Sequence, residues 1–297
     1  MPLRSLAMLV ALAALWGGSF VFMRVAVPAI GPIPLTFARV ALAALVLLAV
    51  AAGQHRIPDF RTHWRGLAIV GIVNSAVPFV LFCFAEQYLT ASTAAILNAT
   101  SPFFGAIAAA LWLGDPLTAR KLAGMALGLA GVGLVVGWHP EPITANVALA
   151  IAACLGAALC YGLGGVYAKR RMQHVPSFAL ACGSQATAAL ALMPTLPFTT
   201  VPGPVSTLVV ANVLALAIAS TAIAYLLYFR LIAEVGPALA LMVTFLIPLF
   251  GVLWGTLFLG EAVTPNMLEG GVLILAGLAL ALNLRAAQRS ATPAAPR

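Results

Sequence analysis

Two acidic residues, Asp115 and Glu261, lie near the ends of segments that repeat one pattern at an offset of 146 positions. Residues 98–118 read NATSPFFGAIAAALWLGDPLT, and residues 244–264 read TFLIPLFGVLWGTLFLGEAVT. A carboxylate in a membrane carrier can relay protons when burial raises its pKa. In both copies, however, a threonine suited to cap the following helix stands three residues after the acid. We therefore interpret the two acids as braces of a turn.

The same segments each hold a proline near the middle of an apolar run, Pro102 and Pro248. A helical proline has no N–H for the carbonyl four residues earlier, which belongs to Asn98 in the first copy and to Thr244 in the second. Freed carbonyls beside polar side chains favour a binding site between the halves of a carrier. We predict that Asn98 and Thr244 contact a substrate and that both prolines break or kink their helices. Kinks that serve only packing are the alternative.

Aromatic residues in the apolar runs also correspond between the two halves of the chain. Trp16 corresponds to Tyr161, and Phe79 corresponds to Tyr225. Such pairs suit an apolar cavity that holds a few hydrogen-bonding groups, whereas helix packing or an aromatic belt at the membrane surface is the alternative. With Ser101 and the two residues beside the prolines, they form the predicted substrate-binding set: Trp16, Phe79, Asn98, Ser101, Tyr161, Tyr225 and Thr244.

Arg39 is the one charged residue clearly inside an apolar run. At 1.5 Å per residue it lies roughly 9 Å from the outer end of its span, and Glu86 ends the next span near the same face. An Arg39–Glu86 pair at an outer gate is one hypothesis, and snorkelling of Arg39 or its bonding to helix-end carbonyls is the favoured alternative. None of the seven carboxylates falls at the middle of a predicted span. We therefore expect facilitated diffusion, or coupling through a group at the membrane edge, rather than a buried carboxylate relay.

The elements that must position these residues are membrane-spanning helices. The chain has 297 residues, of which 63% are apolar and 7% are charged, whereas soluble domains carry roughly 25% charged residues. We predict an all-α integral membrane protein in which ten runs are long enough to cross the bilayer. The runs are residues 5–26, 33–52, 65–86, 90–112, 119–138, 147–168, 177–194, 206–229, 237–259 and 265–284.

Lysine and arginine residues indicate the orientation of these spans. With both termini inside the cell, thirteen of the fifteen basic residues fall on the inside. The two exceptions are Arg24, which falls on the outside, and Arg39, which lies within a span. An excess of positive charge in cytoplasmic segments favours this N-in, C-in arrangement.

Internal repetition extends beyond the paired segments. From Asn74 to Leu134, 17 of 61 residues are identical to those 146 positions later. Because each half has an odd number of spans, the second half must be inverted in the membrane. We therefore predict one membrane domain built from two inverted five-helix repeats, residues 1–140 and 141–297, the second ending in a short basic cytoplasmic tail.

The sequence disfavours other classes of function. It has no nucleophile–base pair, no metal-ligand spacing and no GxxxxGK phosphate loop, so we expect neither an enzyme nor a bound cofactor or metal. The four cysteines lie inside apolar runs at no metal-ligand spacing. The net charge of +8 is distributed between apolar runs rather than clustered on one face, so we expect no nucleic-acid partner.

Several of these features together resemble a known family. The stretch WGGSF at residues 16–20, the intramembrane Arg39 and the pattern P-x-F-G…L-x-L-G-[DE]-x-x-T in both halves are similar to the EamA-type branch of the drug/metabolite transporter superfamily, over nearly the whole chain. Within that branch the chain resembles YddG-type amino-acid exporters. The resemblance implies export by alternating access at a central cavity between the repeats. We also expect a monomer or weak homo-oligomer in the lipid bilayer of the cell inner membrane.

The substrate follows less directly from the sequence. With no cation predicted at the centre, phosphorylated substrates are disfavoured, and an aromatic, neutral cavity suits zwitterionic or apolar metabolites. We therefore expect small metabolites, above all aromatic and neutral amino acids. Export of other amphipathic metabolites or drugs is an alternative, and an oligomeric membrane channel or structural protein is the alternative from a different class.

Overall fold

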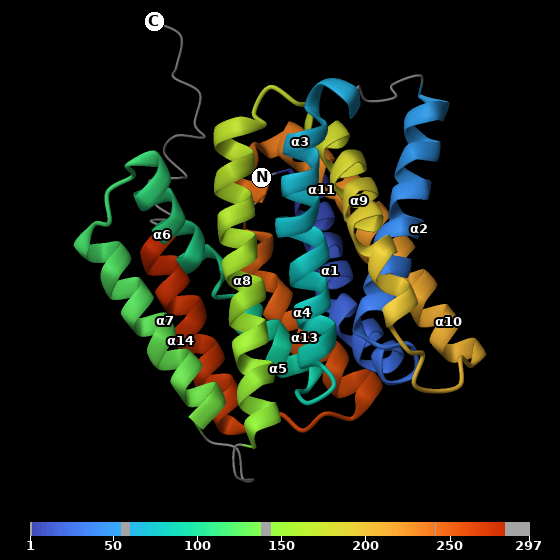
Figure 1. Cartoon of the computed structure of the whole chain (residues 1–297). Coiled ribbons are helices and arrows are strands. Elements are labelled where there is room, and N and C mark those ends of the chain that lie inside the picture. The colour runs from blue at the N-terminus through green and yellow to red at the C-terminus, as the bar shows by residue number, and fades with distance from the viewer. Residues whose placement is uncertain (1, 55–59, 138–143, 241, 283–297) are drawn as a thin grey trace, which may run out of the picture.

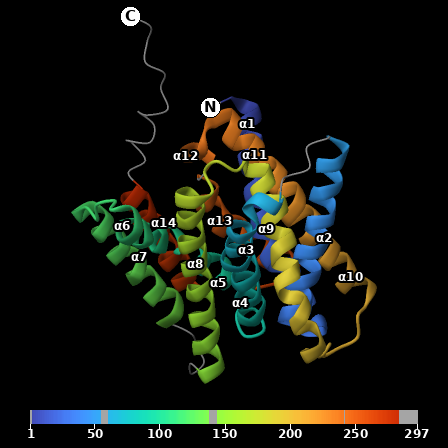
Figure 2. The same ribbon diagram turned by 45° about the horizontal axis from the view of Figure 1, so that its top comes forward.

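The computed structural model of the chain describes residues 2–54, 60–137, 144–240 and 242–282. Helices account for most of these residues, and no strand occurs among them. Figure 1 shows the bundle, and Figure 2 shows it turned so that its upper end comes forward. The elements are α1 (Leu3–Ile30), α2 (Pro32–Gly53), α3 (Phe60–Gly71), η1 (Ile72–Ala76), α4 (Val77–Ala85), α5 (Ala91–Asn98), α6 (Ser101–Leu113), α7 (Ala119–Gly137), α8 (Ala145–Arg171), α9 (Ser177–Leu192), η2 (Met193–Phe198), α10 (Thr207–Leu214), η3 (Ala215–Ile223), α11 (Ala224–Val235), α12 (Pro237–Ala240), α13 (Val243–Leu259) and α14 (Pro265–Leu282).

The helices have the length and composition of membrane spans. Within the described residues, seven helical stretches are long and apolar enough to cross a bilayer, and two shorter apolar helices, Val243–Leu259 and Pro265–Ala281, follow them. The chain is therefore an all-α, multi-pass membrane protein, as predicted. The described parts of all ten predicted ranges are largely helical, while the count of ten crossings and the direction in which they face stay predictions.

Matching glycines end the two copies of the repeated segment. Gly114 after α6 has a φ of 72°, and Gly260 after α13 has a φ of 65°, a left-handed conformation that glycine adopts without steric cost. The hydroxyls of Thr118 and Thr264 then each accept a hydrogen bond, at 3.3 Å, from the N–H three residues later. The predicted N-caps are therefore confirmed, and both copies use the same turn chemistry.

Helices α7 and α14 pack along each other in opposite directions (Figure 1). Glycines bring their backbones into contact: a Cβ on Gly131 would lie 2.6 Å from the carbonyl oxygen of Gly270, and a Cβ on Gly124 would overlap the carbonyl of Gly277. At the offset of 146, Gly124 corresponds to Gly270 and Gly131 to Gly277. The offset therefore exchanges the two contacts, so each half supplies equivalent glycines to the same helix pair.

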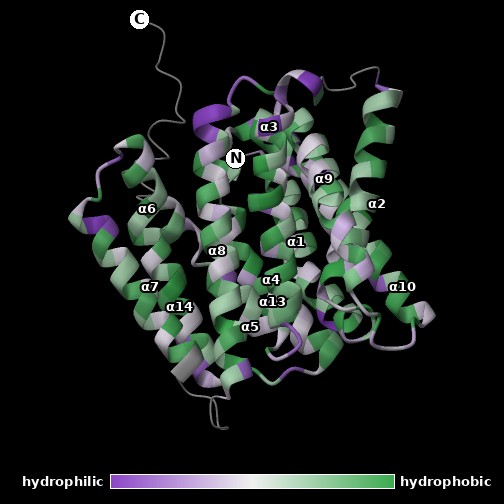
Figure 3. Ribbon diagram, viewed as in Figure 1, coloured by the Kyte–Doolittle hydropathy of each residue, from purple (hydrophilic) through white to green (hydrophobic). Residues whose placement is uncertain are grey.

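One end of the bundle carries most of its positive charge. It is the upper end in Figure 1, where α3, α7 and α9 begin and α8 ends, and hydrophilic residues gather there in Figure 3. We call it the basic end. Its described basic residues are Arg4, Arg61, Arg65, Arg120, Lys121, Lys169, Arg170, Arg171 and Arg230.

The remaining arginines complete this distribution. Arg24 lies on the last two turns of α1, toward the opposite end, and Arg39 lies between the two ends on α2. The other arginines that entered the orientation argument lie outside the described residues; they are Arg56, Arg285, Arg289 and Arg297.

The two acids of the repeated segments have different surroundings. The carboxylate of Glu261 accepts hydrogen bonds from the N–H of Ala91 at 2.8 Å, from the N–H of Ser92 at 2.9 Å and from the Ser92 hydroxyl at 2.5 Å. It therefore caps the N-terminus of α5, whose first N–H groups have no partner within the helix. We call this contact the Glu261 clamp. The acid is a brace, as interpreted, but it braces a helix of the other half rather than its own turn.

Asp115 makes no comparable contact. Its side chain is partly exposed, and no hydrogen bond or ion pair of its carboxylate is found among the described residues. The same motif therefore closes one end of the bundle and leaves the other end unclamped.

This asymmetry leads to a testable difference in stability. We expect Glu261→Ala to lower the free energy of unfolding by about 1–2 kcal/mol, because the first N–H groups of α5 lose their acceptor. Asp115→Ala, the matched variant in the other copy, should change it little. Thermal unfolding of the two purified variants in detergent measures the difference, and equal losses of stability would contradict the clamp.

Candidate functional site

A cavity of about 460 Å³ lies inside the bundle, where helices of both halves meet. All seven residues predicted to bind substrate line it, together with Arg39 and Pro102. The aromatic part of its wall consists of Trp16, Phe20, Phe79, Phe82, Tyr161, Tyr225, Tyr228 and Phe229. The hydroxyl and amide groups come from Ser19, Asn74, Asn98, Ser101, Ser177, Ser184, Ser220 and Thr244.

The aromatic rings form two groups within this wall. The Trp16 ring lies 6.4 Å from Tyr225, edge to face, and 5.3 Å from Tyr228, measured between ring centroids. On the other side, Phe82 and Tyr161 stack with their centroids 6.2 Å apart and an interplanar angle of 26°. These separations are typical of aromatic contacts that fix ring orientation. The cavity therefore presents extended aromatic surface to anything that it holds.

Arg39 supplies a positive charge to the cavity. Its side chain is buried at 4% exposure, with the guanidinium carbon 3.6 Å from the centroid of the Phe79 ring. Its Nε donates a hydrogen bond to the hydroxyl of Thr221 at 3.0 Å, and a terminal nitrogen lies 3.5 Å from the sulfur of Met23. Among the described residues no carboxylate lies within 4.0 Å of it.

This position corrects two expectations. Arg39 does not snorkel to the membrane surface, and the centre of the bundle is not free of cations. We expected Arg39 to lie outside the centre because it is only about six residues from the outer end of its predicted span. The cavity extends far enough along α2 to include Arg39 in its wall. A guanidinium held by an aromatic face and a hydroxyl keeps its charge available to an anionic group.

Two π-helical segments in corresponding positions shape the wall. Asn74 lies in η1 and Ser220 lies in η3, and the offset of 146 relates the two residues, which both line the cavity. In η3 the hydroxyl of Thr221 donates to the carbonyl of Leu216, five residues earlier, at 2.8 Å. Its oxygen therefore remains available to accept from Arg39. π-Helical turns occur frequently at functional sites because they redirect side chains.

The first proline marks a helix break at the cavity. Helix α5 ends at Asn98, and α6 begins at Ser101 with Pro102 in its first turn. The hydroxyl of Ser101 donates to the Asn98 carbonyl at 2.6 Å and lies 3.2 Å from the side-chain oxygen of Asn98. The carbonyl predicted to be free is therefore engaged by a neighbouring hydroxyl, and both residues still face the cavity.

The second proline does not break its helix, while the predicted kink at Pro248 stays a prediction. Helix α13 runs continuously through Pro248, which is buried and does not line the cavity. The preceding helix, α12, ends earlier, at Ala240. Because α13 begins only at Val243, the carbonyl of Thr244 lies in its first turn, where the missing N–H of Pro248 does not interrupt a preceding helix. Thr244 lines the cavity as predicted.

The hypothesis of a pair between Arg39 and Glu86 is not supported, since no such ion pair forms among the described residues. Glu86 directly follows α4, is fully buried and does not line the cavity. Neither of its carboxylate oxygens has a hydrogen-bond partner, while the guanidinium of Arg24 donates to its backbone carbonyl. The two side chains stay apart because Glu86 lies one turn beyond the cavity residue Phe82, while Arg39 turns toward the aromatic wall.

The cavity extends toward the basic end and is closed at the opposite end. Ala168 and Ile232 line it beside the charged segments of α8 and α11, and Ser177 lines it at the start of α9. At the opposite end Val27 and Leu89 are at most 2% exposed and belong to the main apolar core. A solute held in the cavity is therefore separated by packed side chains from the end that carries Glu86.

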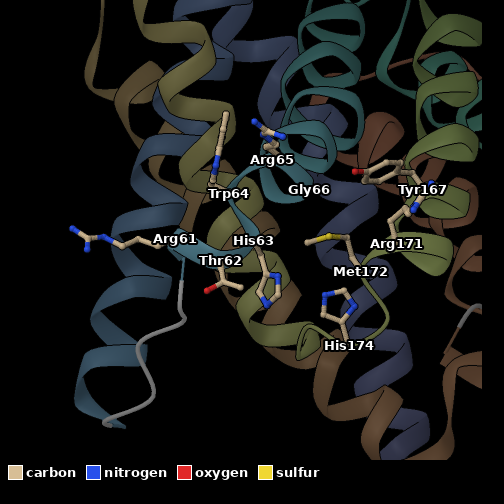
Figure 4. A pocket seen from close by; sticks show the side chains of 10 residues that line it. All are labelled: Arg61, Thr62, His63, Trp64, Arg65, Gly66, Tyr167, Arg171, Met172 and His174. Atoms are coloured by element: carbon tan, nitrogen blue, oxygen red, sulfur yellow. The ribbon is translucent and has the colours of Figure 1, made fainter.

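A second cavity, of about 450 Å³, lies at the basic end between the start of α3 and the end of α8 (Figure 4). Arg65 and Arg171 contribute to its wall, and the rings of His63 and His174 meet edge to face with their centroids 4.9 Å apart. This surface gathers positive charge beside the end toward which the main cavity extends. It has none of the residues predicted from the repeat.

Several residues of the main cavity were not predicted. Phe20 and Tyr228 complete the aromatic wall, and each lies three or four positions after a predicted residue, Trp16 and Tyr225. Residues at that spacing share one face of a helix, so helical spacing from the predicted residues was a usable signal. For Ser184 on α9 no comparable signal exists, since no predicted residue lies on that helix.

Comparison with known proteins agrees with this architecture. The EamA-like transporter family matches the chain twice, over residues 3–137 and 148–283. A probable terminal-alkyne amino-acid exporter of Streptantibioticus cattleyicolor is 27% identical over 89% of each chain. The uncharacterized transporter YvbV of Bacillus subtilis is 25% identical over 97% of this chain and 94% of its own.

Two further matches extend the comparison. An S-adenosylmethionine/S-adenosylhomocysteine transporter of Chlamydia trachomatis is 27% identical over 86% of this chain and 82% of its own. A solved crystal structure superposes with a TM-score of 0.67 over 98% of this chain and 99% of the other, at 21% identity, which shows a common fold. Since the family match covers both halves, this chain belongs to the EamA-like transporter family.

Proposed function

We propose that this transporter exports small metabolites that carry a carboxylate, above all aromatic and neutral amino acids, by alternating access at the central cavity. The observation that carries the proposal is Arg39, a buried cation without an acidic partner among the described residues, in an aromatic wall. A guanidinium binds carboxylates through charge-assisted hydrogen bonds. The aromatic wall supplies the apolar contact area for the rest of the substrate.

The amino group of such a substrate would find acceptors in the same cavity. No aspartate or glutamate lines the cavity among the described residues, so a bound ammonium would rely on uncharged oxygens and ring faces. The side-chain oxygen of Asn98 and the faces of Trp16 and Tyr161 are suited to this role. The expected order of preference is therefore an amino acid over the corresponding amine, which lacks the carboxylate.

The relatives support this substrate class without deciding it. One relative is named as a probable amino-acid exporter, and another as a transporter of S-adenosylmethionine and S-adenosylhomocysteine. The seven predicted residues, Trp16, Phe79, Asn98, Ser101, Tyr161, Tyr225 and Thr244, are proposed as the binding set because they share the wall with Arg39.

The proposed direction of transport rests on the basic end. We place this end in the cytoplasm, so that the chain is N-in and C-in in the inner membrane, because cytoplasmic segments carry the excess of lysine and arginine. The cavity then extends toward the cytoplasm, as in a state ready to load an export substrate. In the other half of the cycle the two inverted repeats, proposed as residues 1–140 and 141–297, would exchange their arrangements.

Transport by the purified protein in liposomes tests the proposal. Liposomes loaded with unlabelled tryptophan should accumulate labelled tryptophan by exchange, and phenylalanine should compete, whereas tryptamine should compete at least tenfold less. Protein-free liposomes and liposomes with Gly17→Ala, which disrupts a tight contact between α1 and α13, are the controls. If the protein exchanged no neutral or aromatic amino acid, this result would contradict the substrate assignment.

A further inference from the structure

Glu86 is the one carboxylate of the described residues that is both fully buried and without a hydrogen bond to either oxygen. Its exposure is 0%, and both side-chain oxygens lack a partner. It sits directly after α4, at the end of the bundle opposite to the cavity mouth, and is not part of the cavity wall. The transport site therefore does not use this side chain in the conformation described here.

The nearest charged groups do not bind the Glu86 carboxylate. Arg24 on α1 directs its guanidinium to the backbone carbonyl of Glu86 rather than to the side chain. Glu261, before α14, faces Glu86 as a like charge, while its own oxygens are occupied by the Glu261 clamp. A cation and a second acid thus flank Glu86, and neither satisfies it.

The groups on the other packed elements do not satisfy it either. Arg39 on α2 acts on Glu86 only at long range, since it is held by Phe79 and Thr221. Two buried thiols, Cys83 on α4 and Cys154 on α8, lie within electrostatic range of the carboxyl. A neutral thiol is a weak donor and cannot replace the water that an ionised carboxylate needs.

These surroundings favour the protonated form of Glu86. An ionised carboxylate that is buried without a donor is strongly unfavourable, so such groups take up a proton. Burial raises the pKa of the Glu86 carboxyl well above its usual range, with Glu261 acting in the same direction and Arg24 and Arg39 opposing it. Glu86 is therefore neutral in this conformation over a pH range in which an exposed glutamate would be charged.

We propose that Glu86 is a proton-binding site that latches the end of the bundle opposite to the basic end. While this end is closed, the carboxyl keeps its proton. When the end opens and water enters, the O–H bond ionises, the proton passes to water, and the carboxylate becomes free to pair with Arg24 one helix away. The proposal rests on the proposed transport cycle, in which this end must open.

The direction of the pH effect follows from linkage. The closed state binds the proton more tightly than the open state, so low pH stabilises closure and this stabilisation is lost as pH rises through the raised pKa. Because one proton is involved, the equilibrium between the two states changes by at most about tenfold per pH unit. Since Glu86 has no contact with the cavity, the proton returns to the side from which it came, and substrate movement carries no net proton.

Exchange of labelled tryptophan at equal pH on both sides of the liposome membrane tests the latch. The wild-type rate should rise with pH, by up to about tenfold per unit in the sensitive range. Glu86→Gln, which mimics the protonated form in size and charge, should exchange slowly at all pH values. Glu269→Gln is the matched control, because Glu269 is an exposed acid near the N-terminus of α14, at the same end of the bundle.

Two outcomes would overturn the latch. One is an unchanged pH dependence in Glu86→Gln. The other is proton movement that accompanies tryptophan stoichiometrically, read from a pH-sensitive dye inside the liposomes.

An infrared pH titration of the purified protein separates this proposal from the proposed function, because it needs no substrate. Above the pH at which exposed carboxyl groups have ionised, the carbonyl stretch of a protonated carboxylic acid should be present in the wild type and in Glu269→Gln, disappear as pH rises further, and be absent in Glu86→Gln. A band that persists in Glu86→Gln would refute the proton site. If no amino acid is exchanged but the band behaves as expected, the substrate assignment fails and the proton site stands.

Discussion

Gly17→Ala is expected to reduce the yield of folded, active transporter severely. A Cβ at residue 17 on α1 would lie 2.7 Å from the Cβ of Phe250, 2.8 Å from the backbone nitrogen of Gly251 and 3.0 Å from the carbonyl oxygen of Ile247. Two of these atoms belong to the backbone of α13, so the helices must separate. Overpacking of this kind costs about 1–3 kcal/mol or more.

The loss should extend to transport, because α1 and α13 carry adjoining parts of the cavity wall. Trp16 precedes the substituted glycine on α1, and Ile247 lines the cavity from α13. The measurements are the fraction of monodisperse protein after extraction in detergent and the thermal unfolding midpoint. Both should fall, together with tryptophan exchange per mole of protein.

The adjacent glycine provides the matched control. A Cβ at Gly18 would have its nearest neighbour, the Cδ1 of Trp254, at 3.6 Å, an ordinary van der Waals distance. Gly18→Ala changes the same residue type one position along the same helix, so it carries the same change in backbone entropy. We expect it to fold with wild-type yield, and similar losses in the two variants would show that helix contact at Gly17 is not the cause.

Replacing Arg39 should have the largest effect on transport without a comparable loss of folded protein. Arg39→Gln removes the charge that we assign to the substrate carboxylate but retains a hydrogen-bonding side chain. A hydrogen bond to a charged group contributes about 1.5–3 kcal/mol, so kcat/KM for tryptophan should fall by about 10–100-fold. Arg39→Lys should also be impaired, since a lysine ammonium neither stacks on Phe79 nor offers the planar fork of donors.

Substrate selectivity distinguishes a binding role of Arg39 from a structural one. Loss of a carboxylate partner should weaken tryptophan and leave competition by tryptamine unchanged, so the preference for tryptophan should disappear in Arg39→Gln. Arg230→Gln is the control, because Arg230 is an exposed arginine that pairs with Glu234 on its own helix at 3.4 Å. An Arg39→Gln variant that exchanges tryptophan at the wild-type rate would contradict the proposed function.

Much of the cavity could be predicted because it lies at the meeting place of two repeats. Corresponding residues near the middle of matching spans converge on the pseudo-symmetry axis, which is why Trp16 and Tyr161, like Phe79 and Tyr225, reach one wall. The repeat also reveals the shared turn chemistry at Thr118 and Thr264. Symmetry in the sequence was therefore a sound guide to residues that lie close to the axis.

Other features were beyond sequence reasoning because they depend on helix rotation or on the other half. A helix that is apolar on all sides has no polar face to indicate how it is rotated about its axis. The sequence therefore could not show that Arg39 points toward Phe79 rather than toward Glu86. The partner of Glu261 lies about 170 positions earlier, at Ala91 and Ser92, and nothing in the spacing identifies it. The continuous helix through Pro248 depends on where α13 begins, a boundary that short apolar runs do not define.

The Glu261 clamp has a practical consequence for reagents that must distinguish the two ends of the molecule. Two loops of near-identical chemistry, 114–118 and 260–264, differ in whether their acid is engaged by a helix end. An antibody selected for loop 260–264 would meet an acid whose oxygens are already bound, whereas one selected for loop 114–118 would meet an acid without a hydrogen bond among the described residues. The duplicated motif therefore provides two similar epitopes in one chain, and antibody binding to one loop can serve as the reference for binding to the other.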